Sequence, residues 1–392
     1  MLIKSDKLKG ILERAYEGKA PTREECVYLL EFEETSMESS MIRAVSNDII
    51  RRNSENSAII LGQIGVDITK CPGGCKFCTF GEDHTAMVEK RLTDEELRQK
   101  VKEFVQMGDL YGLYLMMMHD YELPVLLNAI NISKELSPKT TQIWVNIGDT
   151  DLDTFKELKK AGVTGVYHVC RINEGVDTKL KPEDRIATMD NALEADLELY
   201  TCLEPIGPEH TPQMLVDNMF IGIERGIYQH AAMRRVAVPG SPLAKYGQIS
   251  NLRLAQIVAV VGLASFMVPT MAYLGIHEPN ELSYASGSNI ITAESGCNPR
   301  DTNNDTAKGR GMDMNDCRKM LWECGFDYLR RGDESKIALT KEYVDQCSQI
   351  KARTKIHDKS HQIRELRDES VRSPQQFVLQ IGASTIKKGN ER

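Results

Sequence analysis

The sequence has no run of basic residues and no stripe of Lys and Arg interleaved with aromatic residues. Acidic residues outnumber basic ones by 57 to 49, which gives a formal net charge of −8. Surfaces that bind nucleic acids are strongly basic, so this balance argues against a nucleic-acid partner. The chain also lacks an internal repeat and a low-complexity block, and no repetitive or disordered architecture is expected.

Long apolar runs are lacking as well. The most apolar segment, 254–268, is too short to span a bilayer and contains Gln256 and Ser265. No signal-peptide pattern is present, so the ten cysteines in 392 residues indicate a reducing compartment and metal chemistry rather than a disulfide framework. We therefore expect a cytoplasmic protein that has no membrane partner. Its content of 41% hydrophobic residues is enough for one large domain with appendages.

Paired CxxC units, which are typical of closed zinc sites, are also missing. Three cysteines instead stand in one short loop, CPGGCKFC, at Cys71, Cys75 and Cys78, directly after an apolar run at 58–68. Thiolates are the usual protein ligands of iron–sulfur clusters, and a cluster of four irons normally takes four of them. The next cysteine along the chain is Cys170. One iron would therefore keep an open position, which is a feature of reactive metal centres.

The two glycines of this loop, Gly73 and Gly74, give its backbone the turn conformations needed to wrap a cluster. Two alternatives stay open from the residues alone. One is a zinc knuckle with a distant fourth ligand, and the other is a set of unrelated buried thiols.

Short apolar runs alternate with amphipathic helical stretches over residues 58–326, which predicts an α/β fold, a (β/α)8 TIM-type barrel. An incomplete six-strand barrel with a separate C-terminal piece is the main rival. Residues 1–56 are expected to form a helical lead-in, 57–330 the barrel, and 331–392 a charged helical extension and tail. The eight strands are predicted at 58–68, 110–118, 142–147, 165–170, 197–203, 231–238, 268–274 and 289–293.

Polar residues gather directly after the predicted strands, where the reactive face of such a barrel lies. They are His119 and Asp120 after the second strand, Arg171, Asn173 and Glu174 after the fourth, Glu204 and Glu209 after the fifth, and Glu294, Cys297, Arg300 and Asp301 after the eighth. We expect the cysteine loop and these side chains to surround one cavity.

The CxxxCxxC spacing, with Phe77 before the last cysteine, resembles the signature of radical S-adenosylmethionine (SAM) enzymes. The resemblance implies that Cys71, Cys75 and Cys78 hold a [4Fe–4S] cluster whose open iron chelates the methionine moiety of SAM. It further implies that the backbone at Phe77 contacts the adenine. One electron, from a donor such as flavodoxin or ferredoxin, would cleave SAM to a 5′-deoxyadenosyl radical that abstracts hydrogen from a small substrate.

Residues 40–330 are most similar to the biotin synthase-like branch, which includes biotin synthase, methylornithine synthase, hydrogenase-cofactor maturases and archaeal two-protein lipoyl synthase. Two further stretches carry this resemblance, 176–185 and 239–243. In the first, Asp177 is implied to contact the SAM ribose and Arg185 to pair with the SAM carboxylate. The alternative for Arg185 is a surface position in the first turn of a helix.

The sequence also departs from the family at two points. Three methionines, 116–118, precede His119 and Asp120 where many members have a Gly-Gly-Glu-like motif for the SAM amino group, and these methionines are equally explained as core filler. The adenine-binding segment keeps Ile206 but with altered spacing.

On the substrate side, our candidates are Glu204, Glu294, Cys297 and Arg300. The implied reactions belong to the biosynthesis of a cofactor or an unusual amino acid. A possible second iron–sulfur cluster, required for sulfur insertion, would have to use Cys297 with Cys317 and Cys324, although the latter two are favoured as buried thiols. Biotin synthase proper is disfavoured. A non-catalytic iron–sulfur accessory protein is the alternative from a different functional class.

Overall fold

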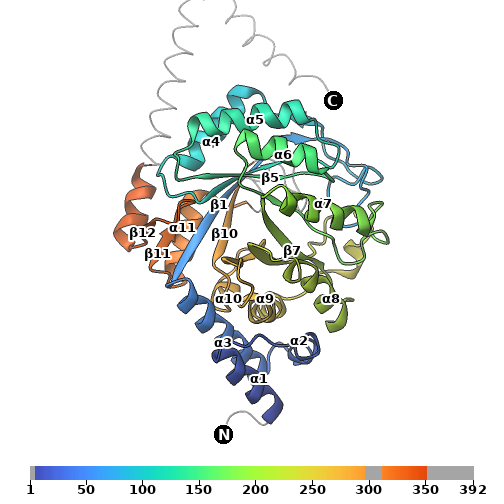
Figure 1. The fold of residues 1–392 in the computed structure, drawn as a ribbon, viewed down its shortest axis with the longest axis vertical. Helices are drawn as coiled ribbons and strands as arrows, with labels where there is room; N and C mark the ends of the chain where they lie inside the picture. The colour runs from blue at the N-terminus through green and yellow to red at the C-terminus, as the bar shows by residue number, and fades with distance from the viewer. Residues whose placement is uncertain (1–4, 296–310, 351–392) are drawn as a thin grey trace, which may run out of the picture. The chain divides into compact units, whose positions relative to one another are not determined.

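The computed structural model describes residues 5–295 and 311–350. Eight parallel strands close into a barrel in the order β1-β4-β5-β6-β7-β8-β9-β10, and β10 returns to β1 with Ile59 opposite Ile290 (Figure 1). The predicted (β/α)8 barrel is confirmed, and the six-strand alternative is wrong. The strands are β1 (Ser57–Gly65), β4 (Gly112–Met116), β5 (Gln142–Asn146), β6 (Gly165–Tyr167), β7 (Glu198–Ile206), β8 (Gln229–Arg234), β9 (Tyr273–Ile276) and β10 (Ile290–Ser295).

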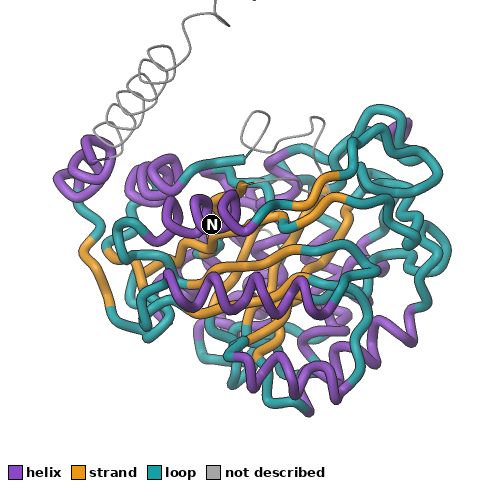
Figure 2. The backbone as a smooth tube through the Cα atoms, turned by 90° about the horizontal axis from the view of Figure 1, so that it is seen from above, coloured by secondary structure: helices purple, strands orange, loops and turns teal. Residues whose placement is uncertain are grey.

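Helices follow the strands and surround the barrel, with the strands inside (Figure 2). Their ends are set by local sequence signals. Thr93 and Glu96 form a capping box at the start of α4, and Gly162, with φ of 102°, ends α6 in the left-handed conformation that glycine adopts at low cost. The helices are α4 (Asp94–Val105), α5 (Leu123–Leu136), α6 (Leu152–Ala161), α7 (Pro182–Glu194), α8 (Pro212–Ile223), α9 (Asn251–Ser265), α10 (Glu281–Tyr284) and α11 (Met314–Glu323).

Three helices precede the barrel: α1 (Asp6–Tyr16), α2 (Arg23–Leu30) and α3 (Met37–Asn53). Each has a Ser or Thr at its N-cap whose hydroxyl accepts a backbone N–H, which satisfies an otherwise unpaired donor. They pack on the outside of the barrel, where α2 contacts α8 and both α2 and α3 contact α9. Helix α9 is therefore covered on all sides, and every residue from Leu254 to Ser265 is buried.

Two predicted strands are displaced from their observed positions. Residues 268–272 form a turn after α9 in place of the start of the seventh strand, because Pro269 cannot donate to a strand ladder and favours a turn. The strand β9 begins only at Tyr273. The sixth strand, β8, begins at Gln229 and ends at Arg234, and the chain then turns through a hydrogen bond from Val238 N to Val236 O of 2.9 Å.

A small hairpin lies at the amino-terminal end of the barrel. Its strand β11 (Tyr328–Arg330) pairs in parallel with β1 through Ser57 and Ala58, and β12 (Lys336–Ala338) pairs antiparallel with β11. Part of this hairpin occupies 331–340, where we expected a charged helical extension to begin. Residues up to Thr340 form one compact unit, and residues 341–350, which are helical, belong to a second.

Candidate active site

The cysteine loop lies between β1 and α4, at the carboxyl end of the barrel strands. It leaves β2 (Asp67–Ile68), which pairs with β3 (Lys90–Arg91) on the return. The loop is closed by backbone hydrogen bonds from Cys71 N to Phe80 O at 2.9 Å and from Cys78 N to Cys75 O at 3.1 Å. Gly74 has φ of 55°, a conformation that costs other residues about 1–2 kcal/mol.

Backbone hydrogen bonds join this loop to the two other stretches that carry the family resemblance. Lys76 N donates to Asp177 O at 2.9 Å, and Leu243 N donates to Lys76 O at 3.1 Å. Lys179 N donates to Gly73 O at 2.8 Å. Three segments far apart in the sequence, 71–78, 176–185 and 239–243, therefore form one side of the site, and their main chains fix its geometry.

All three cysteines of the motif line one cavity at the mouth of the barrel, with a volume of about 1250 Å³ including its open entrance. Apolar side chains pack around two of the sulfurs. They are Ile68, Phe80, Met116 and Met118, which contact Cys71 and Cys78. The methionines of 116–118 thus pack as an apolar wall of this cavity, and no Gly-Gly-Glu-like turn takes their place.

The chemistry of these thiols fits an iron–sulfur cluster. Burial raises the pKa of Cys75 to about 11 and raises that of Cys78 well above its ordinary range. Ionising them therefore requires a strongly positive partner, which a metal centre provides. Among the described residues, no three His, Cys, Asp or Glu side chains converge closely enough to hold one metal ion. Each cysteine of a cubane binds a different iron, so three thiols that line one cavity fit a cluster.

Arg171, after β6, forms the polar wall facing the cysteines. Its Nε lies 3.2 Å from Glu204 Oε1, and its guanidinium carbon lies 5.9 Å from the centre of the Phe77 ring. Glu204 is buried and accepts a hydrogen bond of 2.7 Å from the Tyr167 hydroxyl. Burial opposes the charge on Arg171, yet the nearby carboxylates of Glu174 and Glu204 hold its pKa well above the ordinary value. The cavity therefore contains a fixed cation with a compensating anion.

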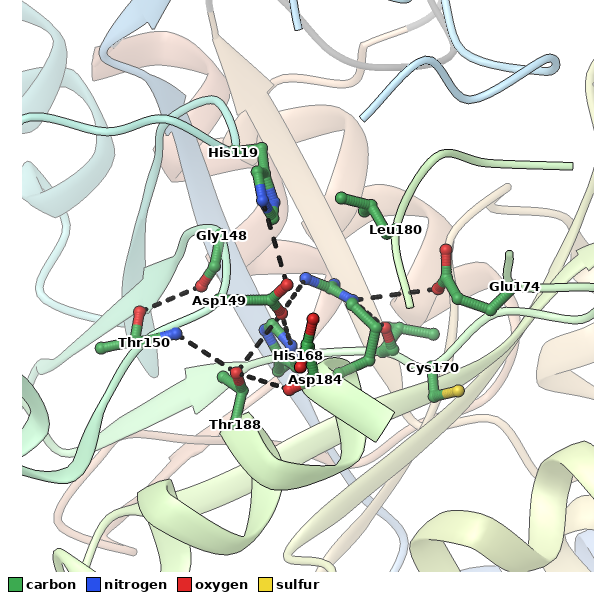
Figure 3. A network of polar contacts seen from close by, with 12 residues as sticks. His119, Gly148, Asp149, Thr150, His168, Cys170, Glu174, Leu180, Asp184 and Thr188 are labelled. Carbon is green, nitrogen blue, oxygen red and sulfur yellow. Dashed lines mark hydrogen bonds and ion pairs between the residues drawn. The ribbon is translucent and has the colours of Figure 1, made fainter. Parts of the chain in front are cut away.

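Arg185 belongs to a second polar network, in which Figure 3 shows the labelled residues Asp149, His119 and His168. It is 4% exposed, so its surface alternative is wrong. Its Nη1 donates to Asp149 Oδ1 at 2.8 Å, and its Nε donates to the backbone oxygen of Val169 at 2.9 Å. The carboxylate of Asp149 also lies 3.3 Å from His168 Nε2 and 3.9 Å from His119 Nε2. One carboxylate thus holds an arginine and two histidines on the cavity wall.

Burial and neighbouring charges set the protonation states of the residues in this network. Burial would raise the pKa of Asp149, but His168 and Arg185 hold it well below its usual range. Burial and the charge of Arg185 lower the pKa of His168 to about 3, so this imidazole is neutral at pH 7. Burial also lowers the pKa of His119. Both histidines are therefore neutral and Asp149 is negative. Arg185 is the cation of this network that an anionic ligand group would meet.

The turn that presents Asp149 depends on a glycine. A Cβ on Gly148 would lie 2.0 Å from the backbone oxygen of His119, so only glycine lets the chain after β5 pass so close to the chain after β4. This approach brings Asp149 within reach of His119. Thr188 then accepts a hydrogen bond of 3.2 Å from Thr150 N and donates one of 3.3 Å to Asp149 Oδ1, which fixes the turn onto α7.

The structure brings some of the predicted site residues together and leaves others apart. The three cysteines, Phe77, Arg185 and Glu204 line the same cavity. Asp177 and Ile206 are not among its lining residues: the Asp177 carboxylate accepts a hydrogen bond of 3.2 Å from Asn173, and Ile206 is buried at the end of β7. Glu294, on β10, lines a neighbouring pocket. Cys297 and Arg300 lie outside the described residues, and Cys317 is fully buried.

Sequence reasoning missed several residues of this cavity, Asp149 above all. Asp149 directly follows the third barrel strand, so the rule that polar residues after strands form the site also applied to it. Tyr167 and Tyr200 line the cavity too but resemble ordinary core residues in sequence. Arg235, another lining residue, is paired bidentately with Glu209 at 2.5 and 2.9 Å.

No protein-family model and no curated protein sequence matches this chain. Solved structures similar to it include HydG, a maturase of the [FeFe]-hydrogenase, with a TM-score of 0.68 and 19% identity over 83% of this chain and 76% of that one. HydG from Carboxydothermus hydrogenoformans has a TM-score of 0.68 and 16% identity over 82% of this chain and 79% of that one. Methylornithine synthase (PylB) has a TM-score of 0.65 and 17% identity over 81% of this chain and 96% of that one.

These neighbours are of the kinds that the cysteine motif led us to expect, hydrogenase-cofactor maturases and methylornithine synthase. The barrel fold that the resemblance implies is therefore confirmed. In the part of the chain that the structure describes, no helix has both the length and the apolar character needed to cross a membrane.

Proposed function

We propose that this chain is a radical SAM enzyme of the biotin synthase-like type that abstracts hydrogen from a small substrate. The observation that carries the proposal is the placement of Cys71, Cys75 and Cys78 on one wall of a barrel cavity. Arg171 and Arg185 line the same cavity. A set of soft thiolate ligands beside fixed cations suits an iron–sulfur cluster and an anionic cosubstrate.

In this proposal the three cysteines ligate a [4Fe–4S] cluster, and SAM binds at the remaining iron. The cluster, when bound and reduced by a donor such as flavodoxin or ferredoxin, supplies the electron that cleaves SAM to a 5′-deoxyadenosyl radical. Arg185 binds the SAM carboxylate, since a planar guanidinium matches a carboxylate bidentately and Asp149 fixes its orientation. Phe77, which lines the cavity, lies along the adenine, whereas Asp177 and Ile206 do not line the cavity and are not assigned to SAM.

The chain's own residues also exclude water from the reaction. The barrel closes on itself, and the cavity walls are buried methionine, tyrosine and phenylalanine side chains. A reactive carbon radical then meets only the bond presented to it. Glu204, Glu294, Cys297 and Arg300 are our proposed substrate-side residues, and the product is a cofactor or an unusual amino acid made in the cytoplasm. We further propose a division into a helical lead-in at 1–56, the barrel at 57–330 and an extension at 331–392.

The test is to incubate anaerobically reconstituted, reduced protein with SAM and to measure 5′-deoxyadenosine. We expect product well above that of a control in which all three motif cysteines are alanine. Product equal to that control, from protein that nevertheless binds a cluster, would leave the accessory iron–sulfur protein as the better reading. Iron and sulfide counts address the second cluster: about four irons per chain exclude sulfur insertion from an auxiliary cluster, and about eight support it.

A further inference from the structure

The barrel lumen below the cavity is filled by aromatic rings in mutual contact. The chain is only 6% aromatic, yet six of its 13 tyrosines and one of its two tryptophans gather here. Their members are Tyr111, Tyr114, Trp144, Tyr167, Tyr200, Tyr228 and Tyr273, which we call the aromatic column. Phenylalanine would fill the same space without a hydroxyl. A tyrosine hydroxyl buried without a partner costs about 1–3 kcal/mol, so packing alone does not explain six tyrosines.

The column is continuous from the cavity downward. Tyr114, Tyr167 and Tyr200 line the cavity itself. The ring centroids of Tyr167 and Tyr200 are 5.0 Å apart, those of Tyr200 and Tyr114 are 6.1 Å apart, and Tyr114 stacks on Trp144 at 5.2 Å.

Below Trp144 the column continues to the amino-terminal end of the barrel. The ring centroids of Trp144 and Tyr228 are 6.2 Å apart, those of Tyr228 and Tyr273 are 6.3 Å apart, and those of Tyr273 and Tyr111 are 5.2 Å apart. Each step therefore joins rings in or near van der Waals contact.

A carboxylate receives the lower end of the column. Glu334, at the tip of the β11–β12 hairpin, accepts a hydrogen bond of 2.6 Å from the Tyr273 hydroxyl. The hydroxyls of Tyr111 and Tyr228 lie 3.0 and 3.4 Å from the same carboxylate and 2.7 Å from each other, so one of them donates to the other and the second donates to Glu334. Its side chain is 45% exposed, so it connects the column to solvent. Its φ of 64° is unfavourable for a residue with a side chain. Its carboxylate also pairs with Arg330 Nη1 at 3.2 Å.

The upper end also has polar partners for its hydroxyls. Tyr167 donates to Glu204 at 2.7 Å, and the Tyr200 hydroxyl lies 3.1 Å from His277 Nε2. A phenol loses its proton when it loses an electron, so a tyrosine gives up an electron readily only where a base accepts the proton. Tyrosines with such partners therefore stand at both ends of the column.

We propose that the aromatic column is a redox relay that carries one electron from the surface at Glu334 to the cavity and so quenches radicals that fail to react with substrate. This relay rests on the proposed radical chemistry. The stray carbon radical takes a hydrogen atom from the hydroxyl of Tyr167 or Tyr200, which forms a C–H bond and leaves a tyrosyl radical. An electron from the next ring and a proton from solvent, taken up through the open entrance of the cavity, restore that tyrosine.

Each ring in turn gives an electron to the oxidised ring above it, so the missing electron ends at Tyr111 or Tyr273. That tyrosine then passes its proton to Glu334. A thiol in solution then returns a hydrogen atom to the outer tyrosyl radical and leaves as a thiyl radical, while Glu334 releases its proton to solvent. The net result is one radical removed from the cavity and one thiol oxidised by one electron.

Laser flash photolysis tests the relay without SAM or the cluster. The variant Trp322→Phe leaves Trp144 as the single tryptophan. Photo-oxidation of Trp144 should give a tryptophan radical whose absorbance decays as that of a tyrosyl radical rises. Adding Tyr114→Phe and Tyr228→Phe should abolish that rise, whereas Tyr28→Phe in helix α2, far from the column in the fold, should leave it unchanged. A Trp144 radical that decays without any tyrosyl signal, or a signal indifferent to the column variants, overturns the proposal.

A second measurement links the relay to turnover. Reduced, reconstituted protein given SAM but no substrate should accumulate a tyrosyl radical by electron paramagnetic resonance, and Glu334→Gln should change its yield and decay. 5′-Deoxyadenosine formed without a tyrosyl radical refutes the relay and leaves the proposed function intact. Absent 5′-deoxyadenosine refutes the proposed function, and photolysis alone then decides the relay.

Discussion

The two ends of the barrel lumen are built from different chemistry. The carboxyl end holds a cavity lined by cysteines and arginines, and the amino end is packed with aromatic rings and closed by Glu334. At the upper end, charged groups are held next to open space, as with Arg185 beside Asp149. At the lower end, several polar groups pair with one another, as with the Tyr273 hydroxyl and Glu334. Changes at the upper end should therefore reduce binding and reactivity, whereas changes at the lower end should reduce stability.

The largest effect is expected from the cysteine loop. Replacing Cys75 with alanine should remove most bound iron and all SAM cleavage, because a cluster held by two thiolates is poorly retained. The circular dichroism spectrum and melting temperature of the apo protein should barely change, since backbone hydrogen bonds hold the loop. Cys26→Ala, at a buried thiol in α2, is the control that keeps its iron. Full iron content in Cys75→Ala would contradict the assignment of metal binding to the upper end of the lumen.

A large loss of stability is expected at the amino end of β4. Asp109 there accepts two hydrogen bonds from Arg318 of α11, at 2.6 and 2.8 Å, and both side chains are buried. Asp109→Ala should lower the free energy of unfolding by about 3–5 kcal/mol, because the buried guanidinium of Arg318 loses the carboxylate that compensates its charge. Denaturant titration measures this loss.

The matched control is an exposed pair of the same type, Arg98 with Glu135 at 2.8 Å. Glu135→Gln should cost less than about 1 kcal/mol. Equal losses of unfolding free energy in the two variants would mean that burial does not decide how much such an ion pair contributes to stability. The folded fraction of Asp109→Ala should bind iron normally.

At the upper end, Asp149→Asn should lower kcat/KM for SAM cleavage by about 10²-fold, because Arg185 loses the partner that orients it. Steady-state rates of 5′-deoxyadenosine formation measure this effect. Asp153→Asn, at an exposed carboxylate in the first turn of α6, provides the control. An unchanged rate in Asp149→Asn, with full iron content, would remove Arg185 and Asp149 from the cosubstrate site.

The smallest effect is a pH dependence at the lower end. Burial raises the pKa of Glu198, the first residue of β7, to about 7. Its protonated form is favoured in the folded state, so it contributes stability that is complete below the ordinary carboxyl pKa and is lost as the pH rises through 7. Glu198→Gln should remove this loss and raise the melting temperature at pH 8 by roughly 1–3 °C relative to wild type. Melting curves at pH 5 and pH 8 measure it, and an identical shift at both values would contradict the assignment.

Much of the fold was predictable because each strand and helix carries its own local signal. The alternation of apolar runs with capped helices predicted eight strands and a barrel, and the boundaries failed where a local signal was ambiguous. At 268–272 the apolar run continues from α9 through Pro269, and sequence pattern alone does not separate a turn from a strand there. The hairpin at 328–338 was missed because its strands of three residues are too short to show a period.

The candidate site was predictable only in part. The cysteines share one short loop, so their spacing already placed them together. Asp149 and Arg185 are 36 residues apart on different βα units, and their contact depends on how the strands are aligned in the closed barrel. The aromatic column is a similar case, because its rings come from β4, β5, β6, β7 and β9 and from the residues just before β4 and β8, and they become neighbours only when the sheet closes.

The sequence by itself determined the grouping of the three cysteines, the helix ends and the number of strands, since each depends on residues close together along the chain. Only the tertiary structure decided which carboxylate fixes Arg185, which glycine permits that contact, and which hairpin closes the lower end of the lumen. The physical reason is that these choices depend on distances between segments separated by tens to hundreds of residues. Closure of the barrel sets those distances, and no local pattern encodes them.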